Sequence, residues 1–110
     1  MQLFKLTEML NGWFVGGFQP TALSTQAVEV AIKSYKAGAK EERHFHRIAR
    51  EVTLIQSGRV IMNGVEYCAG DIVLIDKMNA TDFLALEDSV TVVVKVPGAI
   101  NDKYFGEPAC

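Results

Sequence analysis

Long hydrophobic runs are absent from this sequence. Nowhere in its 110 residues do about eighteen apolar residues follow one another, which is roughly the length that a membrane-spanning helix needs. The first residues include Lys5 and Glu8, and no apolar run there is long enough for the core of a secretory signal peptide. We therefore expect a cytoplasmic protein with no membrane partner.

Cysteine is scarce. Cys68 and Cys110 are the only two cysteines, and two are too few for the disulfide framework of a small secreted domain. We expect both thiols to be reduced, in keeping with a cytoplasmic protein.

An excess of positive charge is also lacking. Eleven lysines and arginines stand against thirteen aspartates and glutamates, a formal net charge of −2. A protein that binds phosphate backbones needs a basic surface, so nucleic acid is not an expected partner. The 49% of hydrophobic and 22% of charged residues are typical of a globular protein. The length predicts a single domain over residues 1–110.

Helical periodicity is nearly missing as well. Only residues 3–10 could form one or two helical turns, and Asn11 and Gly12 end them. From residue 28 onward, short apolar and β-branched segments alternate with turn residues. Asn63-Gly64 between two such segments predicts a tight hairpin, because both residues tolerate a positive φ. The sequence therefore predicts an all-β, antiparallel sandwich or barrel with at least eight strands.

The strands over 28–35 and 90–96 contain lysines among aliphatic residues. In the first, the alternating aliphatic residues are expected to face the core, which places Lys33 on the solvent side. The same argument places Lys95 outside in the second strand. Neither lysine is therefore a candidate site residue.

Both histidines of the chain lie in one short segment, His44-Phe45-His46. On a strand, residues two apart point to the same face, so both imidazoles project together. Glu51 begins the next predicted strand, and a tight reversal would return its carboxylate to the histidines. Imidazole nitrogen and carboxylate oxygen are ligands of zinc, iron, nickel and manganese. Without further context, two surface histidines would explain the pattern equally well.

The spacing around these residues supplies that context. Gly38, five residues, His44-x-His46, four residues, Glu51, six residues and Gly58 resemble the first motif of the cupin superfamily at every defined position. The pattern fixes five residues over twenty-one positions, so it is specific.

The resemblance covers about residues 28–96 and implies a fold. That fold is an antiparallel double-stranded β-helix, the jelly-roll barrel of cupins, with its barrel core at about 28–97. The chain then divides into an N-terminal aromatic segment, 1–27, this barrel, and a C-terminal tail, 98–110.

The second cupin motif is degenerate in this sequence. After Gly70, cupins carry a proline, a glycine, a metal-binding histidine and an asparagine. The corresponding residues here are Asp76, Met78, Thr81 and Ala85. Thr81 therefore occupies the position of the missing fourth ligand, and a neutral hydroxyl is a poor ligand for a divalent ion.

The resemblance implies one divalent ion, Fe, Zn, Mn or Ni, held by His44, His46 and Glu51 with water at the open positions. The departure at Thr81 leaves a site without metal as the alternative.

Two further residues are candidates for acid–base chemistry. Glu42 shares strand parity with the histidines, although a solvated strand end explains it somewhat better. Tyr67 lies on the return strand of the hairpin next to Cys68, and one of these two side chains must face inward. Met62 and Met78 are expected to fill the core.

Two functions remain open. The first is a metal-dependent enzyme acting on a small sugar-like or carboxylate metabolite, because the resemblance includes isomerases, epimerases, decarboxylases and dioxygenases. The second is a non-catalytic module that binds a small molecule without metal. The metal content of the purified protein distinguishes them.

A homodimer is also expected. A barrel of this length buries limited surface alone, and two-fold pairs are the commonest assembly. Apolar strand faces and the aromatic residues Trp13, Phe14 and Phe18 are the expected contact surface, although these aromatic residues could instead cover the chain's own barrel.

Overall fold

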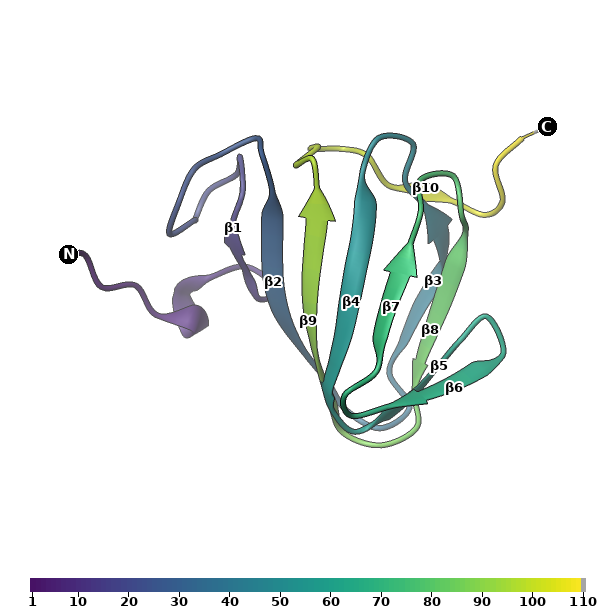
Figure 1. Cartoon of the computed structure of the whole chain (residues 1–110). Helices are drawn as coiled ribbons and strands as arrows, with labels where there is room; N and C mark the ends of the chain where they lie inside the picture. The colour runs from purple at the N-terminus through teal and green to yellow at the C-terminus, as the bar shows by residue number, and fades with distance from the viewer. Residues whose placement is uncertain (110) are drawn as a thin grey trace.

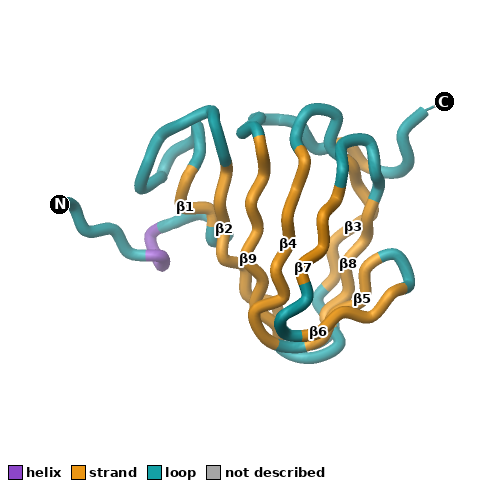
Figure 2. The backbone as a smooth tube through the Cα atoms, in the orientation of Figure 1, coloured by secondary structure: helices purple, strands orange, loops and turns teal. Residues whose placement is uncertain are grey.

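The computed structural model describes residues 1–109 and consists mainly of strands (Figures 1 and 2). Its described strands are β1 (Trp13–Val15), β2 (Glu29–Tyr35), β3 (Lys40–Phe45), β4 (Arg50–Ser57), β5 (Arg59–Met62), β6 (Val65–Cys68), β7 (Ile72–Ile75), β8 (Thr81–Ala85), β9 (Ser89–Val96) and β10 (Tyr104–Phe105). A 3₁₀ turn, η1 (Leu6–Glu8), lies inside the segment predicted to be helical. The all-β prediction is confirmed. No helix in residues 1–109 is long and apolar enough to span a membrane.

The strands form two five-stranded antiparallel sheets (Figure 1). One has the order β1-β2-β9-β4-β7, and the other has the order β10-β3-β8-β5-β6. Strands that are consecutive in sequence often lie in different sheets, as β2 and β3 do, so the chain winds between the two layers. This arrangement is the predicted double-stranded β-helix.

The tight hairpin falls where the sequence places it. Asn63 and Gly64 connect β5 to β6 with φ values of 50° and 77°, the positive values that such a turn requires. The asparagine is held further by its side chain, which donates to the carbonyl oxygen of Ala80 at 3.0 Å.

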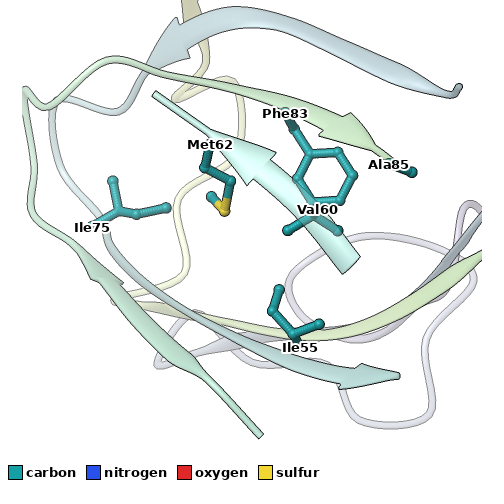
Figure 3. Close-up of a cluster of buried hydrophobic side chains, with 6 residues drawn as sticks. All are labelled: Ile55, Val60, Met62, Ile75, Phe83 and Ala85. Atoms are coloured by element: carbon teal, nitrogen blue, oxygen red, sulfur yellow. The ribbon is translucent and has the colours of Figure 1, made fainter. Parts of the chain in front are cut away.

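A hydrophobic core lies between the two sheets (Figure 3). Ile55 and Ile75 come from one sheet, and the other sheet contributes the remaining buried side chains, Val60, Met62, Phe83 and Ala85. Tyr67 packs against this cluster, whereas the neighbouring Cys68 is exposed with a free thiol.

Two expectations about side chains have separate outcomes. Met78 is 43% exposed, in a turn with a φ of 68°, so the prediction that it fills the core was wrong. Cys110 lies outside the described residues.

The predicted orientation of β2 and β9 was wrong. The two strands pair so that Glu29 lies opposite Lys95 and Lys33 lies opposite Thr91. Glu29, Thr91 and Lys95 are buried, and Lys95 is only 7% exposed. Lys33 is half-buried and lines the space between the sheets. The charged face of these strands therefore points inward.

The aliphatic face of the same sheet points outward. Strand register places two aliphatic rows on it: Val30, Val94, Val52 and Leu74, and then Ile32, Val92, Leu54 and Ile72. Alternation separates the two faces of a strand, but here the apolar face is the outer one because the inner face lines a polar cavity.

Candidate functional site

A cavity of about 390 Å³ opens between the two sheets. Its lining includes the three residues that the first cupin motif singles out, His44, His46 and Glu51. Thr81 lines it as well and lies opposite His44 in the register of β3 and β8. The fold thus places all four residues that the sequence assigned to the metal site on the lining of one cavity. The volume lies in the range of small-molecule sites, roughly 300–1,000 Å³.

His46 is held in one orientation by the C-terminal segment. Its Nδ1 lies 2.5 Å from the carbonyl oxygen of Asp102, and a carbonyl can only accept, so Nδ1 is the donor. Its Nε2 lies 3.5 Å from Oε1 of Glu51. The ring therefore presents Nε2, not Nδ1, to the carboxylate.

His44 is oriented by a similar contact with the backbone. Its Nδ1 lies 2.8 Å from the carbonyl oxygen of Glu42 and must donate to it. Burial lowers the pKa of His44 below its ordinary value, so the neutral imidazole with a free lone pair on Nε2 is favoured. The two imidazoles lie 5.3 Å apart between ring centroids, nearly perpendicular at 81°.

Glu51 is largely buried beside these rings, on β4. Burial alone would raise the pKa of Glu51, but hydrogen bonds with His46 and Thr53 hold it below its ordinary value. The Thr53 hydroxyl donates to Oε2 at 2.9 Å, which leaves Oε1 facing His46. Glu51 is therefore an anion in the folded protein.

The chemistry of these donors fits a divalent metal ion. In both imidazoles the Nδ1–H donates to a backbone carbonyl, which leaves Nε2 free as a ligand atom. Metal-binding histidines usually make such a hydrogen bond with the ring nitrogen that does not bind the metal. In residues 1–109, however, no three His, Cys, Asp or Glu side chains lie close enough together to hold an ion. Binding by His44, His46 and Glu51 therefore requires these side chains to draw together.

The two acid–base candidates, Glu42 and Tyr67, do not line the cavity. A bulge in β3 between Glu41 and His44 shifts the strand register, so that Glu41 lines the cavity and Glu42 is exposed. The parity argument for Glu42 failed because it assumed an unbroken strand. Tyr67 packs on the hydrophobic core instead.

Asp102 is a residue that sequence analysis did not single out. It is 2% exposed, and its carboxylate accepts hydrogen bonds from the backbone N–H groups of Arg47, Ile48 and Ala49 at 2.9 to 3.2 Å. Those three residues form the whole connection between His46 and β4. Asp102 therefore fixes this connection with its carboxylate and orients His46 with its carbonyl.

Charged side chains from β2 and β9 complete the cavity. Lys33 Nζ lies 3.4 Å from Oε1 of Glu41, whose other oxygen accepts from the Tyr35 hydroxyl at 2.7 Å. Burial, followed by the nearby Glu41 charge, raises the pKa of Tyr35 far above its ordinary value. Lys95 Nζ lies 3.7 Å from Oε1 of Glu29. These pairs could not be predicted from the sequence once the lysines had been assigned to the outer face.

The N-terminal aromatic segment covers the cavity. Trp13 and Phe18 line it and meet edge to face, with ring centroids 6.4 Å apart. This placement agrees with the alternative that these residues cover the chain's own barrel.

Comparison with known proteins identifies the fold. No protein-family model and no curated protein matches the chain. Among solved structures, an uncharacterised double-stranded β-helix protein from Klebsiella pneumoniae matches with a TM-score of 0.70 at 20% identity, over 97% of this chain and 93% of its own. KdgF from Halomonas sp. matches with a TM-score of 0.62 at 20% identity, over 68% and 74%.

The bacterial pirin YhhW of Escherichia coli, solved in complex with nickel(II), also matches. Its TM-score is 0.65 at 19% identity, over 80% of this chain and 39% of the pirin. A cupin superfamily protein from Desulfitobacterium hafniense has a TM-score of 0.62 at 9% identity, over 66% and 69%. The chain has the cupin fold, as the motif predicted.

Proposed function

We propose that this protein binds one divalent metal ion through Nε2 of His44, Nε2 of His46 and a carboxylate oxygen of Glu51. The ion and the cavity around it would then hold a small polar metabolite. The observation that carries this proposal is the contact between His46 Nε2 and Glu51 Oε1 at 3.5 Å.

That contact needs a positive charge between its two atoms. Because Nδ1 of His46 donates to Asp102, a neutral ring has only a lone pair on Nε2. A lone pair facing a carboxylate oxygen is repulsive unless a proton or a metal ion lies between them. The neighbouring His44 favours the ion, since its own ring is neutral and also has a free Nε2.

The chemistry of a metal at this position follows from the number of its ligands. Three protein ligands leave positions for water or for a metabolite oxygen, as in catalytic rather than structural sites. A bound ion acts as a Lewis acid, which suits isomerisation, epimerisation or reaction with dioxygen. Iron, zinc, manganese and nickel all accept this donor set, and the nickel of the pirin structure illustrates one choice on the same fold.

Elemental analysis tests the proposal. Protein purified without chelator and supplied with Zn²⁺, Fe²⁺, Mn²⁺ or Ni²⁺ should retain one ion per chain. His46→Ala should abolish uptake while circular dichroism still reports a β-rich fold. Thr81→Ala, which alters the same wall without removing a ligand, should retain it. Absence of uptake from all four metals by the unaltered protein would contradict the proposal.

A metal-free binding module is the second candidate, favoured by one observation. The three candidate ligands do not lie as a compact set in the described chain, and a protonated His46 would satisfy Glu51 directly. In that case the cavity binds its small molecule with protein groups alone. The metal content of the purified protein separates the candidates, because such a module binds its small molecule with no ion present.

A further inference from the structure

Lys95 is a buried cation without a hydrogen-bond acceptor. Its side chain is 9% exposed, and an ammonium carries three N–H donors. The closest carboxylate oxygen, Oε1 of Glu29, lies 3.7 Å from Nζ, beyond hydrogen-bond distance. In residues 1–109 no other group accepts from it. Because Lys95 lines the cavity, its unused N–H donors are available to water or to a ligand there.

We infer that Lys95 donates to a hydroxyl oxygen of an uncharged, sugar-like ligand that lies in the cavity beside Trp13. The inference rests on the proposed function only in using the cavity as a small-molecule site, and it does not require the metal.

The neighbours of Lys95 favour a ligand that both donates and accepts. Register places Glu29 of β2 and Glu51 of β4 on either side of Lys95 in one row across the sheet. Oε2 of Glu29 accepts from the N–H of Ala99 at 2.6 Å and leaves Oε1 free beside Lys95, whereas Glu51 accepts from Thr53 with Oε2 and turns Oε1 toward His46. Glu29 and Lys95 therefore offer an acceptor and a donor side by side, a pattern that a hydroxyl group can match.

The charge of the inner wall disfavours an anionic ligand. The cavity lining carries five carboxylates against three ammonium groups, a formal net charge of −2 before any metal binds: Glu29, Glu41, Glu51, Asp82 and Asp102 against Lys33, Lys95 and Lys103. A ligand carboxylate placed against Lys95 would meet carboxylates on both sides, and like charges at short range repel. An uncharged polyol avoids this cost.

Trp13 supplies an aromatic face next to the same lysines. Lys33 Nζ and Lys95 Nζ lie 5.5 and 5.7 Å from the centre of its ring, within the range of a cation–π contact. An aromatic body beside a few placed polar groups is the usual lining of a small-molecule site. Trp13 is also the only tryptophan of the chain, so its fluorescence reports directly on this cavity.

Fluorescence titration tests the inference. D-glucose, D-galactose, D-mannose and D-xylose are titrated into the protein, with tetrahydropyran as the probe without hydroxyl groups and D-glucuronate as the charged probe. We expect a saturable change with at least one of the four sugars and none with tetrahydropyran. Lys95→Met should weaken the response about tenfold or more, as expected for loss of a hydrogen bond to a charged group. Lys40→Met, at an exposed lysine of β3, should leave it unchanged.

The Lys95→Met variant leaves Glu29 buried without its cation and could fail to fold. The double variant Glu29→Gln with Lys95→Met removes both charges, and thermal unfolding checks that it is folded. It should show the same weakened response. A response in this folded variant equal to that of the unaltered protein would overturn the inference.

Three other results would also overturn it. They are no response to any of the four sugars, an equal response to tetrahydropyran, and a response to D-glucuronate about tenfold stronger than to the sugars.

Metal content is measured on the same samples, with and without EDTA. Protein that takes up metal but binds no sugar refutes the role of Lys95 and leaves the metal proposal standing. Protein that binds a sugar but takes up none of the four supplied metals supports the role of Lys95 and refutes the metal proposal.

Discussion

The two histidines of the site differ from surface histidines in how their rings are fixed. In each ring the Nδ1–H donates a hydrogen bond to a backbone carbonyl oxygen: that of Glu42 for His44 and that of Asp102 for His46. Each therefore keeps Nε2 for the cavity. The presence of a histidine does not by itself establish a metal ligand. A histidine whose Nδ1 is hydrogen-bonded and whose Nε2 is free for coordination is strong support for one.

Restoring a fourth ligand should strengthen metal binding. Thr81 lies opposite His44 across β3 and β8, and its hydroxyl is a weak ligand. We expect Thr81→His to raise metal affinity about tenfold or more, in the range by which single groups at a metal site alter affinity. Competition with a chelator of known affinity measures the change. Thr81→Asn, of intermediate size, should leave the affinity near that of the unaltered protein, and equal affinities for both variants would contradict the expectation.

The hydroxyl of Thr91 should contribute nothing to stability. In the described chain this buried oxygen has no hydrogen-bond partner, and valine has nearly the same shape. We expect Thr91→Val to leave the free energy of unfolding unchanged or to raise it by about 1 kcal/mol. Thr53→Val, which removes the hydroxyl that donates to Glu51, should lower it by about 1–2 kcal/mol. Urea unfolding compares the two, and a large loss in Thr91→Val would show a partner for its hydroxyl.

At the scale of elements, the C-terminal segment belongs to the site. Strand β10 pairs with β3, placing Tyr104 opposite Phe45 and Phe105 opposite His44. The adjacent Asp102 then reaches the connection between His46 and β4. The ends of this connection carry the candidate ligands, so the tail determines how closely they approach.

The pH dependence of stability should reveal Asp102. Burial alone would raise the pKa of Asp102, but the N–H groups of Ala49, Arg47 and Ile48 hold it below its ordinary value. A carboxyl with a lowered pKa stabilises the fold above its unfolded pKa, about 3.9, and that stabilisation is lost as the pH falls through the folded value. We expect Asp102→Asn to lower the melting temperature at pH 7, with a difference that shrinks below about pH 4.

Asp76→Asn is the matched control, because this aspartate is exposed and pairs only at the surface with Arg50. Its melting temperature should follow that of the unaltered protein at each pH. A difference between Asp102→Asn and the unaltered protein that grows as the pH falls would contradict the role given to Asp102.

The whole molecule exposes an unusually apolar sheet face. The two aliphatic rows of the sheet β1-β2-β9-β4-β7 carry no charged residue, and they end at Leu74 and Ile72, which are 57% and 67% exposed. A contiguous apolar face of this kind marks an interaction surface. Because these two rows are uncharged, a second copy of the chain can lie on them without burying an unpaired charge.

We expect a homodimer related by a two-fold axis through this face. Light scattering should report twice the chain mass of 12.1 kDa at micromolar concentrations. Leu74→Glu should shift the protein to the monomer, because it places a charge in the interface. Ile48→Glu, at a residue that is 56% exposed away from the sheet, should not. A mass of one chain for the unaltered protein would refute the dimer.

The strands, the turns and the candidate metal ligands could all be predicted from the amino-acid sequence. Alternating residues and turn residues act locally, so the hairpin at Asn63 and Gly64 and the strand that carries His44 could be predicted without the fold, although His46 lies just beyond the end of that strand. The spacing to Glu51 was equally informative, because a short connection limits where the next strand can begin.

Which side of each strand faces inward becomes visible only in the folded structure. A period of two separates two faces but does not name the inner one, and the rule that apolar residues lie inside fails where the interior is a polar cavity. Lys33 and Lys95 were misplaced for this reason, and a bulge exchanged Glu41 for Glu42. Asp102 lies more than fifty residues from the connection that it holds, a contact that local patterns cannot reveal.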